Sequence, residues 1–195
     1  HLTYQILTKR PERIKDHLPK TCLWCGAQRD DPDGAHVEEV GGPHEHLWWP
    51  WPNIWLGTSI ETQQFAEKRI PQLVNVPAIV HFLSCEPLLG PIDFRSASWK
   101  IVDRIAEGVR EITKDRVSVT VSTPGAAGLL RDIEWVIAGG ESGTNFRKMN
   151  LVWARGIRDQ CKAAGVAFWG KQDSGRYPET PLPDDLNLRE MPENR

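Results

Sequence analysis

The sequence predicts an α/β fold: part of a (β/α) barrel of the TIM type with parallel strands, lacking its first strands and carrying a Cys/His/Trp-rich insert. Three observations predict it. Short segments rich in Ile, Val, Leu, Phe and Trp recur without the alternation of half-exposed strands. Helical patterns lie between several of them, and a polar cluster follows each one. A chain of 195 residues fits one domain, so we assign residues 1–195 to a single unit.

Five segments are expected to form strands that are covered on both faces, because buried parallel strands are almost continuously apolar. They are residues 4–7, 54–59, 79–85, 134–138 and 166–170. Strands that alternate with helices form βαβ units, whose strands run parallel. All of these strands should therefore point the same way.

The helical segments follow from capping residues and periodicity. After the first strand, Pro11 occupies a position where a first helical turn tolerates proline. After the second, an apolar stripe over residues 65–74 is interrupted by Pro71. In the last and clearest helix, Asn150 can cap the start and Gly165 can end it. One face of that helix is apolar: Ala154, Ile157, Cys161 and Ala164.

Two stretches interrupt the alternation of strands and helices and are interpreted as insertions. Residues 19–53 are polar, rich in Cys, His and Trp, and too long for a simple loop. Residues 95–132 contain a helical pattern over 101–112 and a short Val-Ser-Val-Thr-Val ribbon. From Tyr177 onward the chain is rich in Pro and acidic residues, so we expect it to wrap the surface.

Composition argues against several classes of partner. A net charge of -2, without a Lys/Arg block, does not indicate nucleic acid or an anionic membrane. There is neither a bilayer-spanning apolar stretch nor a signal peptide, and four cysteines do not resemble a secreted disulfide framework, so we expect a cytoplasmic protein. Because a strand begins almost at His1, we expect a domain that a missing amino-terminal segment or a partner chain completes.

Polar side chains gather where the predicted strands end. The candidates for binding a substrate or cofactor are Lys9, Arg10, Ser59, Glu61, Glu86, Gly140, Glu141, Lys171 and Gln172. Because parallel strands point the same way, these groups should share one rim, where such folds place their active sites. The plainer interpretation is that strand ends meet water and that Lys9 and Glu86 form a structural ion pair. The sequence assigns no catalytic residue and does not say whether the substrate is small or macromolecular.

The run Gly139-Gly140-Glu141-Ser142-Gly143 has two interpretations. Its backbone N–H groups could form a nest that binds an anion. Equally, its glycines could permit a tight strand-to-helix turn. The run matches neither the Walker nor the dinucleotide fingerprint, so neither a nucleoside triphosphate nor NAD is indicated.

The first insertion contains a candidate structural zinc site. Its ligands would come from Cys22, Cys25, His36, His44 and His46. Two cysteines at Cys-x-x-Cys spacing commonly bind one Zn²⁺ ion together. A polar insert with little core of its own would gain stability from a metal. There is no second Cys-x-x-Cys, and the His spacing is not that of a zinc finger, so two free cysteines near surface histidines is the alternative.

Other conspicuous residues have plainer interpretations. The tryptophans of residues 47–55 more often attach a loop to the core than stack on a base or sugar. Cys161, on the apolar helix face, is expected to be buried and inert. Cys85 could be a nucleophile, but no His follows at a recognisable spacing, and His81 is expected to be a core histidine.

Several ordered blocks of sequence resemble one family. They are ILTKRPER (6–13), PNIWLGTSIE (52–61), FLSCEPLLGP (82–91), WVIAGGESG (135–143), RDQC (158–161) and KQ (171–172). Together they are similar to the phage Gp37/Gp68 family, a domain of unknown function found in phages and bacteria. The resemblance covers most of the chain outside the two insertions.

The resemblance implies an upstream segment with three closely spaced cysteines, similar to the cluster-binding loop of radical S-adenosylmethionine enzymes. In the full-length protein that segment would hold a [4Fe–4S] cluster and S-adenosylmethionine, and about three further strands would complete an eight-stranded barrel. One hypothesis is thus the substrate-facing half of a radical-SAM-like enzyme, inactive alone. The alternative is a non-catalytic, zinc-stapled module that binds a protein or nucleic acid.

Overall fold

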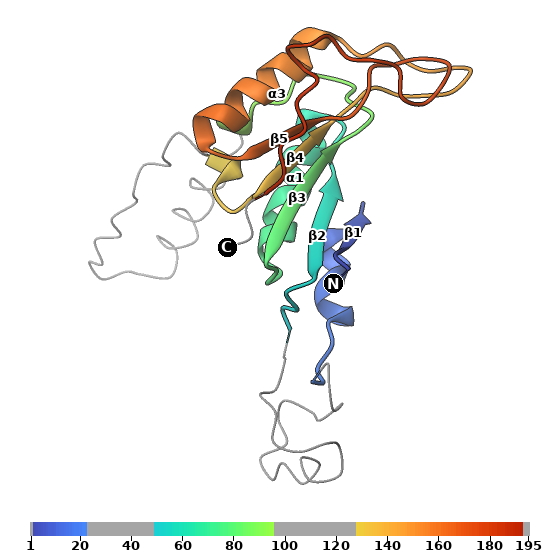
Figure 1. Ribbon diagram of the computed structural model, residues 1–195. Coiled ribbons are helices and arrows are strands. Elements are labelled where there is room, and N and C mark those ends of the chain that lie inside the picture. The colour runs from blue at the N-terminus through green and yellow to red at the C-terminus, as the bar shows by residue number, and fades with distance from the viewer. Residues whose placement is uncertain (1, 23–48, 96–127, 193–195) are drawn as a thin grey trace, which may run out of the picture.

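The computed structural model describes residues 2–22, 49–95 and 128–192 (Figure 1). Its strands are β1 (Tyr4–Thr8), β2 (Ile54–Ser59), β3 (Val80–Cys85), β4 (Trp135–Ala138) and β5 (Ala167–Gly170). They form one parallel sheet in the order β1-β2-β3-β4-β5, so strands that follow each other along the chain are neighbours. The predicted parallel α/β sheet is confirmed.

The carboxyl ends of the strands lie along one edge of this sheet. Thr8 of β1 is paired with Thr58 of β2, and Ser59 is paired with Ser84 of β3. This sequential parallel order is the one found in a (β/α) barrel. However, β1 and β5 lie at opposite ends of the order and do not pair, so the sheet of the described residues is open rather than closed.

The described helices are η1 (Pro11–His17), α1 (Gln63–Val74), η2 (Gly128–Leu130) and α3 (Leu151–Ala164). Both η1 and η2 are short 3-10 helices, and η1 begins at Pro11 as predicted. Pro71, which interrupts the apolar stripe in the sequence, lies inside α1, and the helix continues past it. It does so because one face of the helix is held in the core by Ala66, Ile70 and Leu73.

Both ends of α3 agree with the sequence. The side chain of Asn150 accepts a hydrogen bond from the backbone N–H of Val152 at 3.0 Å. Gly165 adopts a left-handed conformation (φ 69°, ψ 30°), which glycine reaches without steric cost. Three of the four predicted apolar residues of this helix, Ala154, Ile157 and Cys161, are buried.

The two faces of the sheet have different surroundings. On one face, here called the outer face, Leu56, Leu83 and Val136 share a large core with side chains of α1 and α3. On the opposite face, here called the inner face, Trp55, Phe82, Trp135 and Val80 form a smaller cluster. Residues alternate between the two faces along each strand, so the helices cover only the outer one.

The prediction that every strand is covered on both faces is wrong for β1. Its residues Tyr4, Ile6 and Leu7 are 54%, 47% and 50% exposed, whereas every residue of β2 and β3 is buried. The reason is position, because β1 is the edge strand next to β2 only. The apolar composition of β1 therefore predicted correctly that it is a strand, but it did not predict how exposed the strand is.

The carboxyl-terminal segment does more than wrap the surface, as its composition had suggested. Residues 188–190 run antiparallel to β5 and cover its free edge (Figure 1). The N–H of Gly170 donates to the carbonyl of Leu188 at 3.0 Å, and the N–H of Glu190 donates to that of Phe168 at 3.1 Å.

Most of both expected insertions, including the helical pattern over 101–112 and the Val-Ser-Val-Thr-Val ribbon, lies outside the described residues. Within the described part, Trp49 and Trp51 pack against the outer core, which agrees with a loop attached by its tryptophans. Every helix that the structure describes is too short or too polar to cross a bilayer.

Candidate functional site

Aromatic rings form the floor of the inner face. Trp135 lies at their centre, with its ring centroid 5.9 Å from that of Trp55, Phe82 and Trp169. The contacts with the two tryptophans are edge-to-face, at interplanar angles of 80° and 88°. Such arrangements are favoured by the ring quadrupoles and fix a rigid, apolar surface. Gly57 makes room for the ring of Phe82, because a Cβ atom there would overlap it.

A cavity of about 720 Å³ lies on the inner face. The apolar part of its lining comes from three rings of the floor, Phe82, Trp135 and Trp169, and from Leu7, Ile137, Pro181 and Leu182. Its polar part includes Gln5, Ser84, Glu86, Lys171, Asn187 and Arg189. The cavity thus combines apolar walls with many polar groups, and residues 84, 86 and 171 place three of these groups at the carboxyl ends of β3 and β5.

Glu86 and Lys171 form an ion pair across the cavity. The Nζ atom of Lys171 lies 2.9 Å from Oε2 of Glu86, with the two side chains 50% and 20% exposed. Each residue follows the last residue of its strand, β3 or β5, so the aligned strand ends bring them together. The sequence placed both on the rim, but it suggested Lys9 as the partner of Glu86.

Gln172, another predicted rim residue, is buried and fully engaged by the backbone. Its Nε2 donates to the carbonyl oxygen of Gly140 at 3.2 Å, and its Oε1 accepts from the N–H of Glu179 at 3.1 Å. It thereby joins the loop after β4 to the carboxyl-terminal segment. Both Gln172 and Glu179 line the cavity.

Arg189, which the sequence analysis did not single out, closes the side of the cavity next to β5. Its guanidinium lies 5.1 Å from the ring centroid of Trp169, within the range of a cation–π contact. Its NH2 group donates to the carbonyl of Lys171 at 3.2 Å. Pairing between residues 188–190 and β5 holds it there, and this long-range pairing has no local sequence signal.

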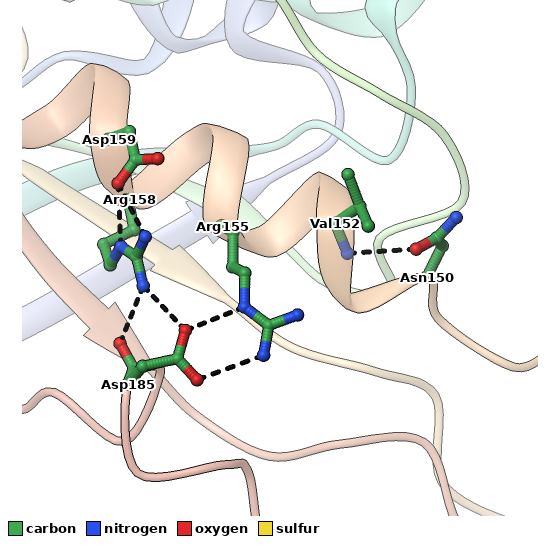
Figure 2. A network of polar contacts seen from close by, with 6 residues as sticks. All are labelled: Asn150, Val152, Arg155, Arg158, Asp159 and Asp185. Carbon is green, nitrogen blue, oxygen red and sulfur yellow. Dashed lines mark hydrogen bonds and ion pairs between the residues drawn. The ribbon is translucent and has the colours of Figure 1, made fainter.

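Arg155 and Arg158 of α3 bind Asp185 of the carboxyl-terminal segment, a group here called the clamp (Figure 2). The clamp fastens to α3 the segment that forms the cavity wall beside β5. Asp185 accepts hydrogen bonds from Arg155 through both carboxylate oxygens, at 2.8 and 3.1 Å. Arg158 reaches the same carboxylate at 2.8 Å and also contacts Asp159. The pKa of Asp185 is lowered, first by the hydrogen bond from Arg155, so this clamp is ionised at neutral pH.

A second group of predicted residues gathers near the end of β1, apart from the cavity. Lys9 lies 2.7 Å from Oε1 of Glu61, and Arg69 of α1 lies 2.9 Å from Oε2. Arg69 also donates to the carbonyl of Ser59 at 2.7 Å. Both carboxylate oxygens of Glu61 are thus engaged, so the group ties β1 and β2 to α1.

The charge of Glu61 is stabilised despite its burial. Burial alone would raise the pKa of this carboxyl, whose residue is only 6% exposed. The hydrogen bond from Lys9, a backbone hydrogen bond and the charges of Lys9 and Arg69 outweigh burial and lower the pKa. A carboxylate held ionised in this way is a poor proton donor, which fits a structural role.

Glu141 forms a third, separate group with Arg147. The guanidinium donates to both carboxylate oxygens at 2.8 Å, and the backbone N–H of Arg147 adds a further bond at 2.8 Å. The side-chain hydrogen bonds lower the pKa of Glu141 to about 2, followed by the backbone bond. Glu141 does not line the cavity of the inner face.

The glycines after β4 serve close packing. A Cβ atom on Gly140 would overlap the backbone N atom of Ser174. The N–H groups of Gly139, Gly140 and Gly143 already donate to the carbonyls of Cys85, Gln172 and Gly175. These three amides are therefore not available to an anion, which favours the tight-turn interpretation.

Comparison with known families gives a match over most of the chain. Residues 1–185 match the family described as Protein of unknown function (DUF5131). The chain belongs to this family. No curated protein and no solved structure matches it. The membership supports a resemblance to an uncharacterised family, and the narrower phage Gp37/Gp68 designation stays a prediction.

Two described cysteines of the DUF5131 chain, Cys85 and Cys161, are not arranged for nucleophilic catalysis. Burial raises the pKa of Cys85 well above its ordinary value, with smaller contributions from Cys161 and Glu61. Burial likewise raises the pKa of Cys161 to about 12. Both thiols are completely buried, which agrees with the inert role expected for Cys161 and disfavours Cys85 as a nucleophile.

The candidate zinc site falls mostly outside the described part of the DUF5131 chain. Cys22 is described and buried, but Cys25, His36, His44 and His46 are not described. Among the described residues, no group of three or more His, Cys, Asp or Glu side chains could hold a metal. The zinc site therefore stays a prediction.

The predicted rim is thus divided into separate groups in this DUF5131 chain. Glu86 and Lys171 share the cavity with Gln172, whereas Lys9, Ser59 and Glu61 lie together elsewhere. Arg10 belongs to neither group and lines a different cavity, under η1. The contributions of Trp169, Arg189 and Asn187 to the cavity were missed by the sequence analysis.

Proposed function

We propose that the inner-face cavity binds a small polar substrate, and that this chain forms the substrate-facing half of a radical-SAM-like (β/α) enzyme. One observation carries the proposal. The inner face of the sheet, which the helices do not cover, carries a cavity with an ion pair at the carboxyl ends of β3 and β5. In parallel (β/α) folds, that is the position of the active site.

The chemistry of the cavity fits a zwitterion with a planar ring. Lys171 can contact a carboxylate and Glu86 an ammonium group, because both already face the cavity as an ion pair. Trp169 offers an aromatic surface, with Arg189 beside it. S-adenosylmethionine combines these features, so it is the probe that the site suggests.

An iron–sulfur cluster does not fit the described residues. Their cysteines are Cys22, Cys85 and Cys161, all buried. Cys85 and Cys161 belong to the outer core, away from the cavity. The described residues hold no group of three metal-ligating side chains, so no reaction step is assigned to a cluster.

Tryptophan fluorescence provides the test, because Trp135 and Trp169 line the cavity. Titration with S-adenosylmethionine should give a saturable change in the wild-type chain. Lys171→Met should weaken binding by about tenfold, the loss of one charge-assisted contact. The matched control is Lys148→Met, which removes an exposed lysine outside this cavity. No saturable response, or equal weakening by both substitutions, would count against the proposal.

The zinc-stapled binding module is retained as a second candidate on one observation, the Cys22-x-x-Cys25 spacing. It predicts one zinc per chain after dialysis, lost in Cys25→Ser. Elemental analysis of both proteins checks this expectation. Less than stoichiometric zinc in the wild-type chain would remove the candidate.

A further inference from the structure

A second cavity, of about 560 Å³, lies on the other side of the sheet. It is bounded by η1, by the outer face of β1 and β2, and by Trp49 and Trp51. Ile6, Ile14, Leu18 and Ile54 give it an apolar lining. Because the inner-face cavity uses Gln5 and Leu7 of β1, the sheet separates the two sites.

Among the described residues that line this cavity, all the ionisable side chains are basic. Arg10, Arg13 and His17 line it, and none of them makes an ion pair with a described residue. Glu12 and Asp16 belong to the same short helix but do not line the cavity. This arrangement contrasts with the arginines of α3 and α1, which are neutralised by carboxylates.

We propose that this cavity is a binding site for a small amphipathic organic anion, free in solution, with a planar apolar body. The apolar body would lie among Trp49, Trp51 and Ile14, and its anionic group would be bound by Arg10 and Arg13. The site requires two features together, unpaired cations and an apolar lining. It is independent of the function proposed for the inner face.

The test uses two probes of similar shape and different charge. Anilinonaphthalene sulfonate carries an anionic group, whereas phenylnaphthylamine is neutral. The wild-type chain should bind one sulfonate per chain saturably, more tightly than the neutral amine. The double substitution Arg10→Gln with Arg13→Gln should weaken sulfonate binding by about tenfold or more and leave amine binding nearly unchanged. Raising the salt concentration should also weaken sulfonate binding, because salt screens the attraction between the arginines and the sulfonate.

The matched control is Lys15→Gln, which removes a cation from the same helix that does not line the cavity. It should leave sulfonate binding unchanged. Melting temperatures of all variants show whether they fold. Binding without saturation, no preference for the sulfonate, or equal weakening by Lys15→Gln would each overturn the proposal.

Discussion

Gly57 shows at the scale of one residue how the inner face is built. A Cβ atom there would overlap the ring of Phe82, which is only 2% exposed and cannot move aside freely. Gly57→Ala should therefore lower stability by about 1–3 kcal/mol, the usual cost of overpacking. Chemical denaturation measures this change.

Gly156 is the matched control, because it lies in α3 and a Cβ atom there would meet nothing within 4 Å. Gly156→Ala should raise stability by about 0.5–1 kcal/mol, since alanine loses less backbone entropy in a helix. If Gly57→Ala were equally harmless, the close approach of Phe82 would not be a constraint.

The carboxyl of Glu141 should titrate well below the ordinary range, because Arg147 stabilises its charged form. A lowered folded-state pKa contributes stability that is present above the ordinary value and lost as the pH falls towards the folded value. The window is thus from 4.5, the ordinary value, down to about 2. NMR titration should give a midpoint near 2 in the wild-type chain. In Arg147→Gln the midpoint should return towards the ordinary value, and an unchanged midpoint would contradict this account.

The sequence predicted which polar residues follow the strands, but not how they pair. Glu86 and Lys171 come together because the register of parallel strands places their ends at one edge. Glu61 instead pairs with Lys9 and with Arg69, a helix residue that no strand-end argument includes. Side-chain direction and helix position decide such pairs, and neither is encoded by the order of strands.

At the scale of elements, the amino-terminal cap of α3 is open to a direct test. Asn150→Ala removes the acceptor for the N–H of Val152 and should cost about 1 kcal/mol. Asn150→Ser retains a capping oxygen and should cost much less. Thermal or chemical denaturation of the two variants checks this, and equal losses would mean that the cap contributes little.

The elements best predicted from the sequence were those with local signals. A capping Asn, a terminal Gly and an apolar stripe fixed both ends of α3. The exposure of β1 was not predictable, because its composition matches that of the central strands and only its place at the sheet edge differs. Likewise, the continuation of α1 past Pro71 depends on tertiary packing, which overrides local propensity.

At the scale of the whole molecule, the carboxyl-terminal segment was the main feature that the sequence concealed. Its Pro-rich, acidic composition resembles that of a surface loop. Its place is set by contacts with partners far away in sequence, including Trp135, whose indole N–H donates to the carbonyl of Glu190. Such long-range pairing completes the cavity wall and has no periodicity to detect.

The clamp on Asp185 should therefore control the cavity from a distance. Asp185→Asn removes the charge that Arg155 and Arg158 share, without changing the cavity lining (Figure 2). Amide hydrogen exchange at Gly170, whose N–H donates to the carboxyl-terminal segment, should become several-fold faster, and S-adenosylmethionine should bind more weakly.

Asp159→Asn is the matched control for the clamp, because Asp159 also accepts hydrogen bonds from Arg158 but belongs to α3 itself. This substitution should leave exchange at Gly170 unchanged. Since the hydrogen bond from Arg155 lowers the pKa of Asp185, the clamp should hold at neutral pH and weaken as the pH falls below the ordinary range of an aspartate. Equal acceleration by both substitutions would show that the loss of an ion pair of Arg158, rather than detachment of the carboxyl-terminal segment, determines the rate of exchange at Gly170. Acceleration by Asp185→Asn alone would show that α3 holds the wall of the cavity in place through a single carboxylate.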